Sequence, residues 1–273
     1  MIELLKEPFV LKAILCGVLI SIPLSGLGLF LVLRRLSLIG DGLAHVSFGG
    51  VSLGILLGKS PLYFAIPVCV LASIGILKVK KVAKISPDAA IGIISSFGIA
   101  SGIAISASKG GFNLEILNYL FGSILSINDR DLLVSLIFSS FFLSYVVLFY
   151  NDLVSTTFDD ELAYAEGINV ERINTILSIF TALTVVQAIK MIGILLVTSL
   201  LIMPPVTALQ LSRGFKSTLL FSMIFGASSV VLGVGLSLIV DLPSGSSIVL
   251  VSFAILLVSL GVARKKLLTS GKN

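Results

Sequence analysis

The only histidine of the chain, His45, follows Asp41 by four residues. On an α-helix, side chains four residues apart lie on the same face, about 5–6 Å from each other. A carboxylate and an imidazole at this spacing can bind one divalent cation, and their oxygen and nitrogen atoms suit Zn²⁺, Mn²⁺ and Fe²⁺. The pair therefore predicts a metal-binding position. Two structural roles stay open beside it: an ion pair that locks two helices, and a loop-end cap, which Gly40 and Gly42 would favour.

The chain that must position this pair is strongly apolar. Hydrophobic residues make up 56% of it and charged residues only 12%, with a mean hydropathy of +1.14, whereas a soluble domain has about 25% charged residues. So few charges cannot cover a water-soluble surface, and the composition predicts an integral membrane protein. A charge inside a membrane span costs at least roughly 2.5–3.5 kcal/mol on insertion, so Asp41 needs a compensating partner. A bound cation would be such a partner.

The apolar runs predict an all-α fold, a polytopic membrane helix bundle with eight or nine transmembrane helices. A bilayer core about 30 Å thick needs roughly 20 apolar residues per helix. The candidate spans are residues 9–33, 36–57, 61–77, 87–107, 132–150, 173–189, 191–211, 218–240 and 246–262. Only Lys190 separates the sixth run from the seventh, so both span counts stay open. Residues 1–273 form a single transmembrane domain in this prediction.

Lysines and arginines concentrate in the connections on one side of these spans, which is normally the cytoplasmic side. Arg34 and Arg35 follow the first span, a lysine cluster follows the third, and further basic residues follow the ninth. This bias predicts an external N-terminus and a cytoplasmic C-terminus. It also accounts for the net charge of +5, so that charge gives no reason to expect a nucleic-acid partner.

Two connections are longer than turns. In this topology residues 109–131 are external, and their apolar core, 114–125, is too short to span, so we expect it to lie at the interface or to dip back into the protein. Residues 151–172 form a cytoplasmic segment and the most acidic part of the chain. Within it, Thr157 is predicted to cap a short helix and Gly167 to end that helix.

Small residues recur at helical spacing inside the spans. Gly50, Gly54 and Gly58 stand four residues apart, as do Gly98 and Gly102. This spacing allows helix backbones to approach closely in lipid. These glycines are therefore predicted to lie where helices pack together.

Asp88 and two prolines are assigned structural roles. Asp88 follows Ser86 and Pro87, a pattern typical of a helix N-cap and first turn, so it is predicted to mark a helix start. Pro204 and Pro205 interrupt the seventh span and predict a kink or break there. A gating role and a static kink both stay open for this position. The sequence contains no HExxH, GxSxG or paired-cysteine motif, and a run at 54–60 has too few residues between its glycines to be a phosphate-binding loop. The chain is therefore predicted to be no enzyme and to bind no nucleotide itself.

Five blocks of the sequence resemble the permease, or transmembrane, subunit of bacterial ABC importers for zinc, manganese and iron. The blocks lie at residues 34–45, 88–92, 119–125, 158–167 and 193–205. They occur in the order of that family and extend across nearly the whole chain, so the combination is specific where a single block would be weak.

The resemblance implies partners and a cargo. It implies a homodimer in the prokaryotic cell membrane that receives a metal ion from an extracytoplasmic metal-binding protein. Two copies of a separate cytoplasmic ABC ATPase would use ATP to drive transport, and no permanently bound cofactor is implied. The cargo would be zinc or manganese, or else iron. The chain has one histidine and lacks the histidine-rich external loops of some zinc importers, so the metal stays open.

The resemblance also implies roles for particular residues. Asp41 and His45 would contact the metal in the translocation path. A coupling segment would dock on the ATPase, and it consists of Phe158, Asp159, Asp160, Glu161, Leu162, Ala163, Tyr164, Ala165, Glu166 and Gly167. The alternative is a secondary transporter or channel for cations that needs no ATPase and uses Asp41 as its ion site.

Overall fold

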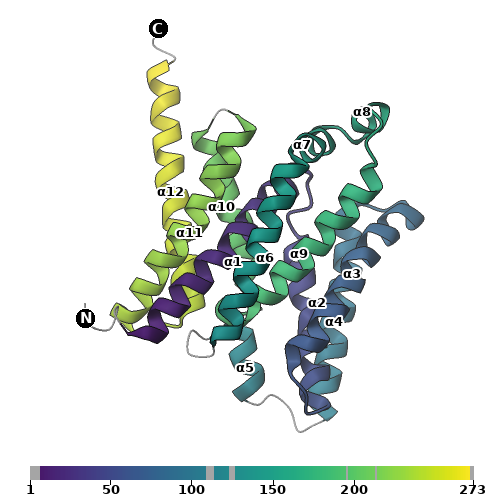
Figure 1. Cartoon of the computed structure of the whole chain (residues 1–273), viewed down its shortest axis with the longest axis vertical. Coiled ribbons are helices and arrows are strands. Elements are labelled where there is room, and N and C mark those ends of the chain that lie inside the picture. Colours follow the sequence, from purple (N-terminus) through teal and green to yellow (C-terminus); the bar gives the residue numbers. More distant parts are fainter. Residues whose placement is uncertain (1–6, 109–113, 123–126, 195, 213, 271–273) are drawn as a thin grey trace.

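The computed structural model describes the chain apart from residues 1–6, 109–113, 123–126, 195, 213 and 271–273, which Figure 1 draws in grey. Throughout the described residues the regular secondary structure is helical. The helices are α1 (Pro8–Leu33), α2 (Ile39–Leu56), α3 (Pro61–Ala83), α4 (Pro87–Ser108), α5 (Leu114–Phe121), α6 (Asp129–Leu148), α7 (Tyr150–Phe158), α8 (Asp160–Ala165), α9 (Val170–Ile192), α10 (Val197–Leu211), α11 (Phe215–Val240) and α12 (Ser244–Ser270). Parts of the predicted external connection 109–131 and of the blocks 119–125 and 193–205 therefore lie outside the described residues.

Eight helices of the described chain are long and apolar enough to cross a membrane, namely α1, α2, α3, α4, α6, α9, α11 and α12. Helix α10 is shorter, with 15 residues, and it takes the place of the remaining predicted span. Figure 1 shows α1 starting low in the view and α12 ending at the top of it, as expected if α10 crosses as well. The prediction of a polytopic helix bundle with eight or nine spans is confirmed.

The predicted boundary between the sixth and seventh spans is wrong. The sequence places the end of the sixth span at Lys190, but α9 continues through this residue to Ile192. The helix ends at Gly193, whose backbone angles, φ 91° and ψ 157°, are open essentially to glycine alone. A Cβ atom there would lie 2.4 Å from the Leu120 carbonyl oxygen. Hydropathy detects the nearest charge and not this backbone requirement.

The short helix α5 packs against the residues between the end of α9 and the start of α10. The Ile194 N–H group donates a hydrogen bond of 3.0 Å to the Tyr119 carbonyl at the end of α5, and α5 also contacts α2. Gly245, at the start of α12, approaches these residues as well, since a Cβ atom on it would lie 2.2 Å from the Ile192 carbonyl oxygen. The described part of the 109–131 connection is thus packed on the bundle.

Helix α2 packs against α3 and α4 most extensively and also contacts α5, α9 and α10. A Cβ atom on Gly50 would lie 2.6 Å from the Cα atom of Ala65 on α3, and one on Gly98 of α4 would lie 2.6 Å from the Cα atom of Val46 on α2. The predicted close approach of helix backbones is confirmed at these positions. Gly58 has another role, because it adopts a φ of 64° in the turn after α2, with open space around it.

Replacing Gly98 by alanine should destabilise the protein by about 1–3 kcal/mol, the usual cost of overpacking, because the new methyl group would meet the backbone of α2. Thermal unfolding of the detergent-purified protein measures this change. Gly92→Ala in the same helix is the matched control, since a Cβ atom at Gly92 has nothing within 4 Å. Equal unfolding temperatures for the two variants would contradict backbone contact between α2 and α4.

Candidate metal site and coupling segment

Asp41 stands in the first turn of a helix and not in its middle. The sequence predicts a span over 36–57, but α2 begins at Ile39, which places Asp41 in its first turn. The N–H groups of a first turn have no intrahelical acceptors, and the helix dipole favours a negative charge there. The start of the helix therefore offers the carboxylate some stabilisation without a cation, in keeping with the loop-end position that the sequence left open.

Asp41 and His45 are the two outward-facing positions in the first part of α2. Every other residue from 39 to 52 is buried, whereas the side chains of Asp41 and His45 are 48% and 25% exposed. Helix α10 lies beside the pair, and the Thr198 hydroxyl donates a long hydrogen bond of 3.5 Å to Asp41 Oδ1. The pair therefore opens onto a surface of the protomer next to α10.

The spacing of the pair suits a chelated metal ion. His45 Nε2 lies 3.4 Å from Asp41 Oδ2, longer than an ordinary hydrogen bond of about 2.7–3.2 Å. Metal–ligand distances of about 2.0–2.2 Å at a tetrahedral angle place two ligand atoms roughly 3.3–3.6 Å apart. The separation of the two atoms is thus compatible with one ion between them. Among the described residues, no group of three or more His, Cys, Asp or Glu side chains comes together, so one protomer offers two such ligands here.

Thr198 escapes the sequence prediction, although it lies in the resembling block 193–205. Its hydroxyl engages the Asp41 oxygen that does not face His45. Partners of this kind orient a ligating carboxylate. No motif connects residues 157 positions apart in the chain, so only the fold reveals the contact.

Helix α10 continues through Pro204 and Pro205, so the predicted break is wrong; the gating kink stays a prediction. Because proline has no N–H group, the carbonyl groups four residues earlier lose their helical donors. Helix α1 covers both. The Ser25 hydroxyl donates to the Leu200 carbonyl at 3.5 Å, and the Leu201 carbonyl oxygen would lie 1.8 Å from a Cβ atom on Gly28. The two prolines thus hold α10 tightly against α1.

Asp88 lies where the sequence predicts, in the first turn of α4. The Ala89 N–H group donates 3.2 Å to the Ser86 hydroxyl, so Ser86 provides the cap and Asp88 supplies the negative charge that a first turn favours. Asp88 is exposed and lies on a different helix from Asp41 and His45.

The acidic segment contains two helices, α7 and α8, and not one. Thr157 lies within α7, so its predicted capping role is wrong. Asp159 is the cap of α8, because its extended backbone lets Oδ1 accept from the N–H groups of Glu161 at 2.9 Å and Leu162 at 3.0 Å. Gly167 follows the end of α8 as predicted, with a φ of 85°. Its N–H group donates 3.0 Å to the Tyr164 carbonyl.

Helix α8 and its flanks present apolar and acidic side chains to solvent. Ala163 is fully buried, whereas Phe158, Leu162 and Tyr164 are 68%, 58% and 76% exposed. The acids of this surface, Asp160, Glu161 and Glu166, are exposed as well. Exposed apolar side chains rimmed by polar ones are typical of a protein interface. This surface lies outside the candidate spans, so lipid tails do not account for it.

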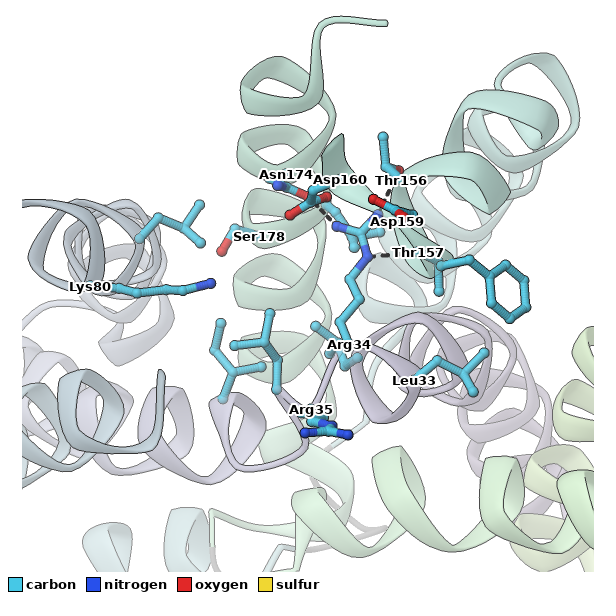
Figure 2. A pocket seen from close by; sticks show the side chains of 16 residues that line it. Leu33, Arg34, Arg35, Lys80, Thr156, Thr157, Asp159, Asp160, Asn174 and Ser178 are labelled. Atoms are coloured by element: carbon cyan, nitrogen blue, oxygen red, sulfur yellow. Dashed lines mark hydrogen bonds between the residues drawn. The ribbon is translucent and has the colours of Figure 1, made fainter. Parts of the chain in front are cut away.

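Arg34 connects this segment to the turn before α2. Figure 2 shows its guanidinium pointing at Thr156 and Thr157, at the end of α7, and at Asn174 of α9. A cavity of about 280 Å³ lies beside it and is also lined by Asp159 and Asp160. Sequence analysis assigns Arg34 only to the cytoplasmic side, because charge bias gives orientation and no partner.

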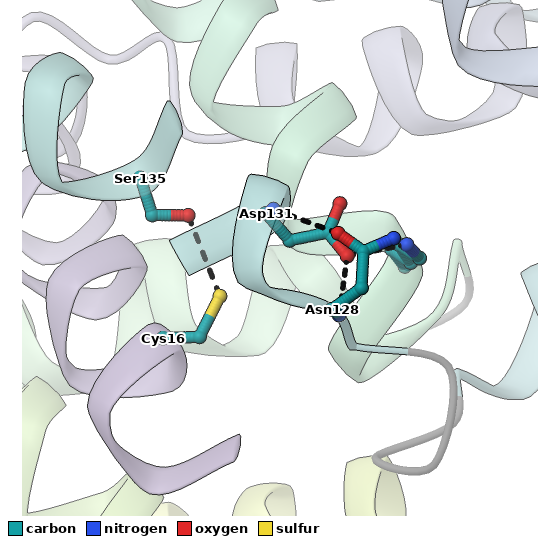
Figure 3. Close-up of polar contacts among 5 residues, drawn as sticks. Cys16, Asn128, Asp131 and Ser135 are labelled. Atoms are coloured by element: carbon teal, nitrogen blue, oxygen red, sulfur yellow. Dashed lines mark hydrogen bonds and ion pairs between the residues drawn. The ribbon is translucent and has the colours of Figure 1, made fainter. Parts of the chain in front are cut away.

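Polar contacts and an ion pair connect the helices at the other end of the bundle, near the start of α6. Figure 3 shows Asn128 and Asp131 at the start of α6, where each side chain accepts a hydrogen bond from the other residue's N–H group at 3.0 and 2.8 Å. Asp131 Oδ2 also pairs with Lys190 Nζ at 2.5 Å, with both side chains mostly buried. Cys16 of α1 lies 3.4 Å from Ser135 of α6. These groups line a cavity of about 390 Å³ and join α1, α6 and α9.

The fold defines a class of protein, a multi-pass helical membrane protein, with an Asp–His pair on α2 and an exposed apolar and acidic surface on α8. The profile described as the ABC 3 transport family matches residues 6–263. The chain belongs to this family, which confirms the resemblance found in the sequence.

Relatives and a solved structure agree over nearly the full length. The chain is 33% identical to the manganese transport system membrane protein MntC of Halalkalibacterium halodurans, covering 92% of this chain and 86% of the relative. It is 34% identical to the high-affinity zinc uptake system membrane protein ZnuB of Haemophilus influenzae, covering 91% and 95%. The structure of PsaBC from Streptococcus pneumoniae in complex with Fab matches with a TM-score of 0.87 at 32% identity, covering 100% and 98%. The chain is thus a multi-pass protein of the prokaryotic plasma membrane.

Replacing Asp159 by alanine should destabilise α8 by about 0.5–2 kcal/mol, since two backbone N–H groups lose their acceptor. Hydrogen–deuterium exchange of residues 160–166 in the purified protein should become faster. Asp159→Asn should retain slow exchange, because an asparagine side chain also accepts, and Glu161→Ala is a control in the same turn. Unchanged exchange in Asp159→Ala would show that the cap does not hold α8.

Proposed function

We propose that this chain is the permease subunit of an ATP-driven importer for a divalent transition metal ion, manganese or zinc, or else iron. The observation that carries the proposal is the 3.4 Å spacing of His45 Nε2 and Asp41 Oδ2 on the outward-facing positions of α2. The printed names of the two relatives, a manganese and a zinc transport protein, support the choice of cargo.

Two copies would form the translocation pathway. One protomer's pair supplies two ligands, while a tetrahedral ion takes four. A two-fold axis beside the pair would bring the same residues together from both copies. The partly exposed side of α10, with Thr198, Ile202 and Val206, lies next to the pair and would form part of the contact. The homodimer would thus complete the ligand set.

The acidic segment would be the coupling surface for a cytoplasmic ABC ATPase, which hydrolyses the ATP. Its support is the exposed apolar and acidic surface of α8, held in place by the Asp159 cap and by buried Ala163. Closure of two ATPase copies would move this segment and open the dimer axis alternately to each side. An extracytoplasmic metal-binding protein would deliver the ion on the other side.

Replacing His45 by alanine or Asp41 by asparagine should reduce metal uptake by more than about tenfold, because even changes in residues that only support a ligand cost 10–100-fold in metal affinity. Uptake of radiolabelled manganese and zinc is measured in cells without another importer. Co-purification of the ATPase should remain normal. Asp88→Asn is the matched control, since it removes an exposed acid from the first turn of a neighbouring helix. Normal uptake by His45→Ala would rule out the site.

Reconstitution separates the importer from a self-sufficient carrier. The permease alone in liposomes should not accumulate metal, whereas the permease with its ATPase and binding protein should do so when ATP is supplied. This result follows if the exposed surface of α8 exists to receive an ATPase. Metal accumulation by the permease alone would support the secondary transporter or channel and contradict the proposal.

A further inference from the structure

The Arg34 side chain joins three elements that are far apart in the sequence. Its Nε atom donates 3.3 Å to Thr157 Oγ1, one terminal nitrogen donates 2.7 Å to Thr156 Oγ1, and the other donates to Asn174 Oδ1. The two threonines lie in the last turn of α7, and Asn174 lies in α9. Arg34 itself follows the last residue of α1.

The three acceptors suit the planar fork of a guanidinium, with one acceptor at each of its nitrogens. The Thr156 and Thr157 hydroxyls each donate their own proton to a backbone carbonyl, of Asp152 at 2.7 Å and of Leu153 at 2.5 Å. Their lone pairs are therefore left to accept. Arginine carries five N–H donors spread over three nitrogens in a planar fork. Lysine carries all of its donors on a single nitrogen, so it cannot span the same three acceptors. The contact thus depends on the shape of arginine as well as on its charge.

Arg34 has no ion pair in the described part of the chain. Burial lowers the pKa of its guanidinium, and the charge of Asp160 opposes that shift. Asp159 and Asp160 line the same cavity of about 280 Å³, as Figure 2 shows. The guanidinium therefore donates its hydrogen bonds to uncharged oxygens, while the cavity beside it is lined by two carboxylates. An element that switches between two arrangements needs a second set of acceptors, and the carboxylates that line this cavity are groups of the type that would serve.

The connection from Arg34 to the metal pair is short and tight. The N–H groups of Arg34, Arg35 and Leu36 donate back to carbonyls of the last turn of α1, at 2.8 to 3.1 Å. Arg35 adopts a φ of 57°, so the chain turns sharply before α2 begins at Ile39. Asp41 follows in the first turn. The segment between Arg34 and the start of α2 is therefore short and held by backbone hydrogen bonds.

We propose that Arg34 is the positioning residue that transmits movement of α7 and α8 to the α1–α2 turn, and so to Asp41 and His45. Metal transport then depends on the fork of hydrogen bonds from Arg34 to Thr156, Thr157 and Asn174. This inference rests on the proposed function and assigns one residue to the coupling step within it.

The test measures metal ions transported per ATP hydrolysed by the complete complex in liposomes, with manganese and with zinc. Arg34→Lys keeps the charge and loses the fork, so this ratio should fall by about tenfold, within the usual range of coupling between two sites. Assembly with the ATPase and basal ATP hydrolysis should persist. Arg35→Gln is the matched control, because Arg35 stands in the same turn, is exposed and lies outside the contact; its ratio should equal that of the wild type.

A second variant, Thr156→Val with Thr157→Val, removes two acceptors and leaves Arg34 in place. It should lower the same ratio, and combining it with Arg34→Lys should add little, because all three changes break one contact. An unchanged ratio in the threonine variant, or an equal loss in Arg35→Gln, would overturn the inference. If Arg34→Lys prevents assembly, the threonine variant decides. A wild-type complex that transports no metal would instead overturn the proposed function.

Discussion

The backbone contacts of α2 determine most of the arrangement around the pair. Glycines bring α3 and α4 so close that a single added methyl group at Gly50 or Gly98 would meet backbone atoms of the neighbouring helix. Close packing of this kind is how helices associate in lipid, because apolar side chains gain little by exchanging contacts with lipid tails for contacts with another helix. Because α2 is enclosed in this way, Asp41 and His45 are the two positions left open in its first part. The same packing fixes the face on which the pair stands.

A second constraint comes from the carbonyl groups that the two prolines of α10 release. Unsatisfied carbonyls are costly in a membrane, so a neighbouring helix must cover them. Ser25 and Gly28 of α1 do so, and Ser25 is itself fixed from α11, because the Ser222 hydroxyl donates 2.8 Å to its carbonyl. Helices α1, α10 and α11 therefore form one packed group. Thr198 lies on the same α10, which links the position of this group to the Asp41 carboxylate.

Sequence patterns predict the features that depend on local chemistry. The bilayer demands apolar helices, so hydropathy locates the spans, and a spacing of four residues is enough to place His45 beside Asp41. Boundaries that depend on backbone geometry escape such patterns. The start of α2 has no side-chain cap, and the end of α9 depends on the backbone angles of Gly193. Thr157 and Asp159 are both residue types that cap helices. Only the fold shows that Thr157 belongs to α7, which leaves Asp159 as the cap of α8. The contacts of Arg34 and Thr198 cross more than 120 residues of sequence, where one sequence offers no signal.

The charge on Asp41 has more than one source of stabilisation. Their magnitudes decide how much of the cost of placing this charge in a membrane a cation would still have to offset. A first-turn position contributes about 0.3–1 kcal/mol, less than the roughly 2.5–3.5 kcal/mol that a buried charge costs in a membrane. Exposure of nearly half of the side chain reduces that cost, and His45 and Thr198 offset more of it. The pair can therefore exist without an ion, yet in the proposed function a cation would satisfy its two polar groups better. An ion carrier needs this balance, because a site that binds too tightly does not release its cargo.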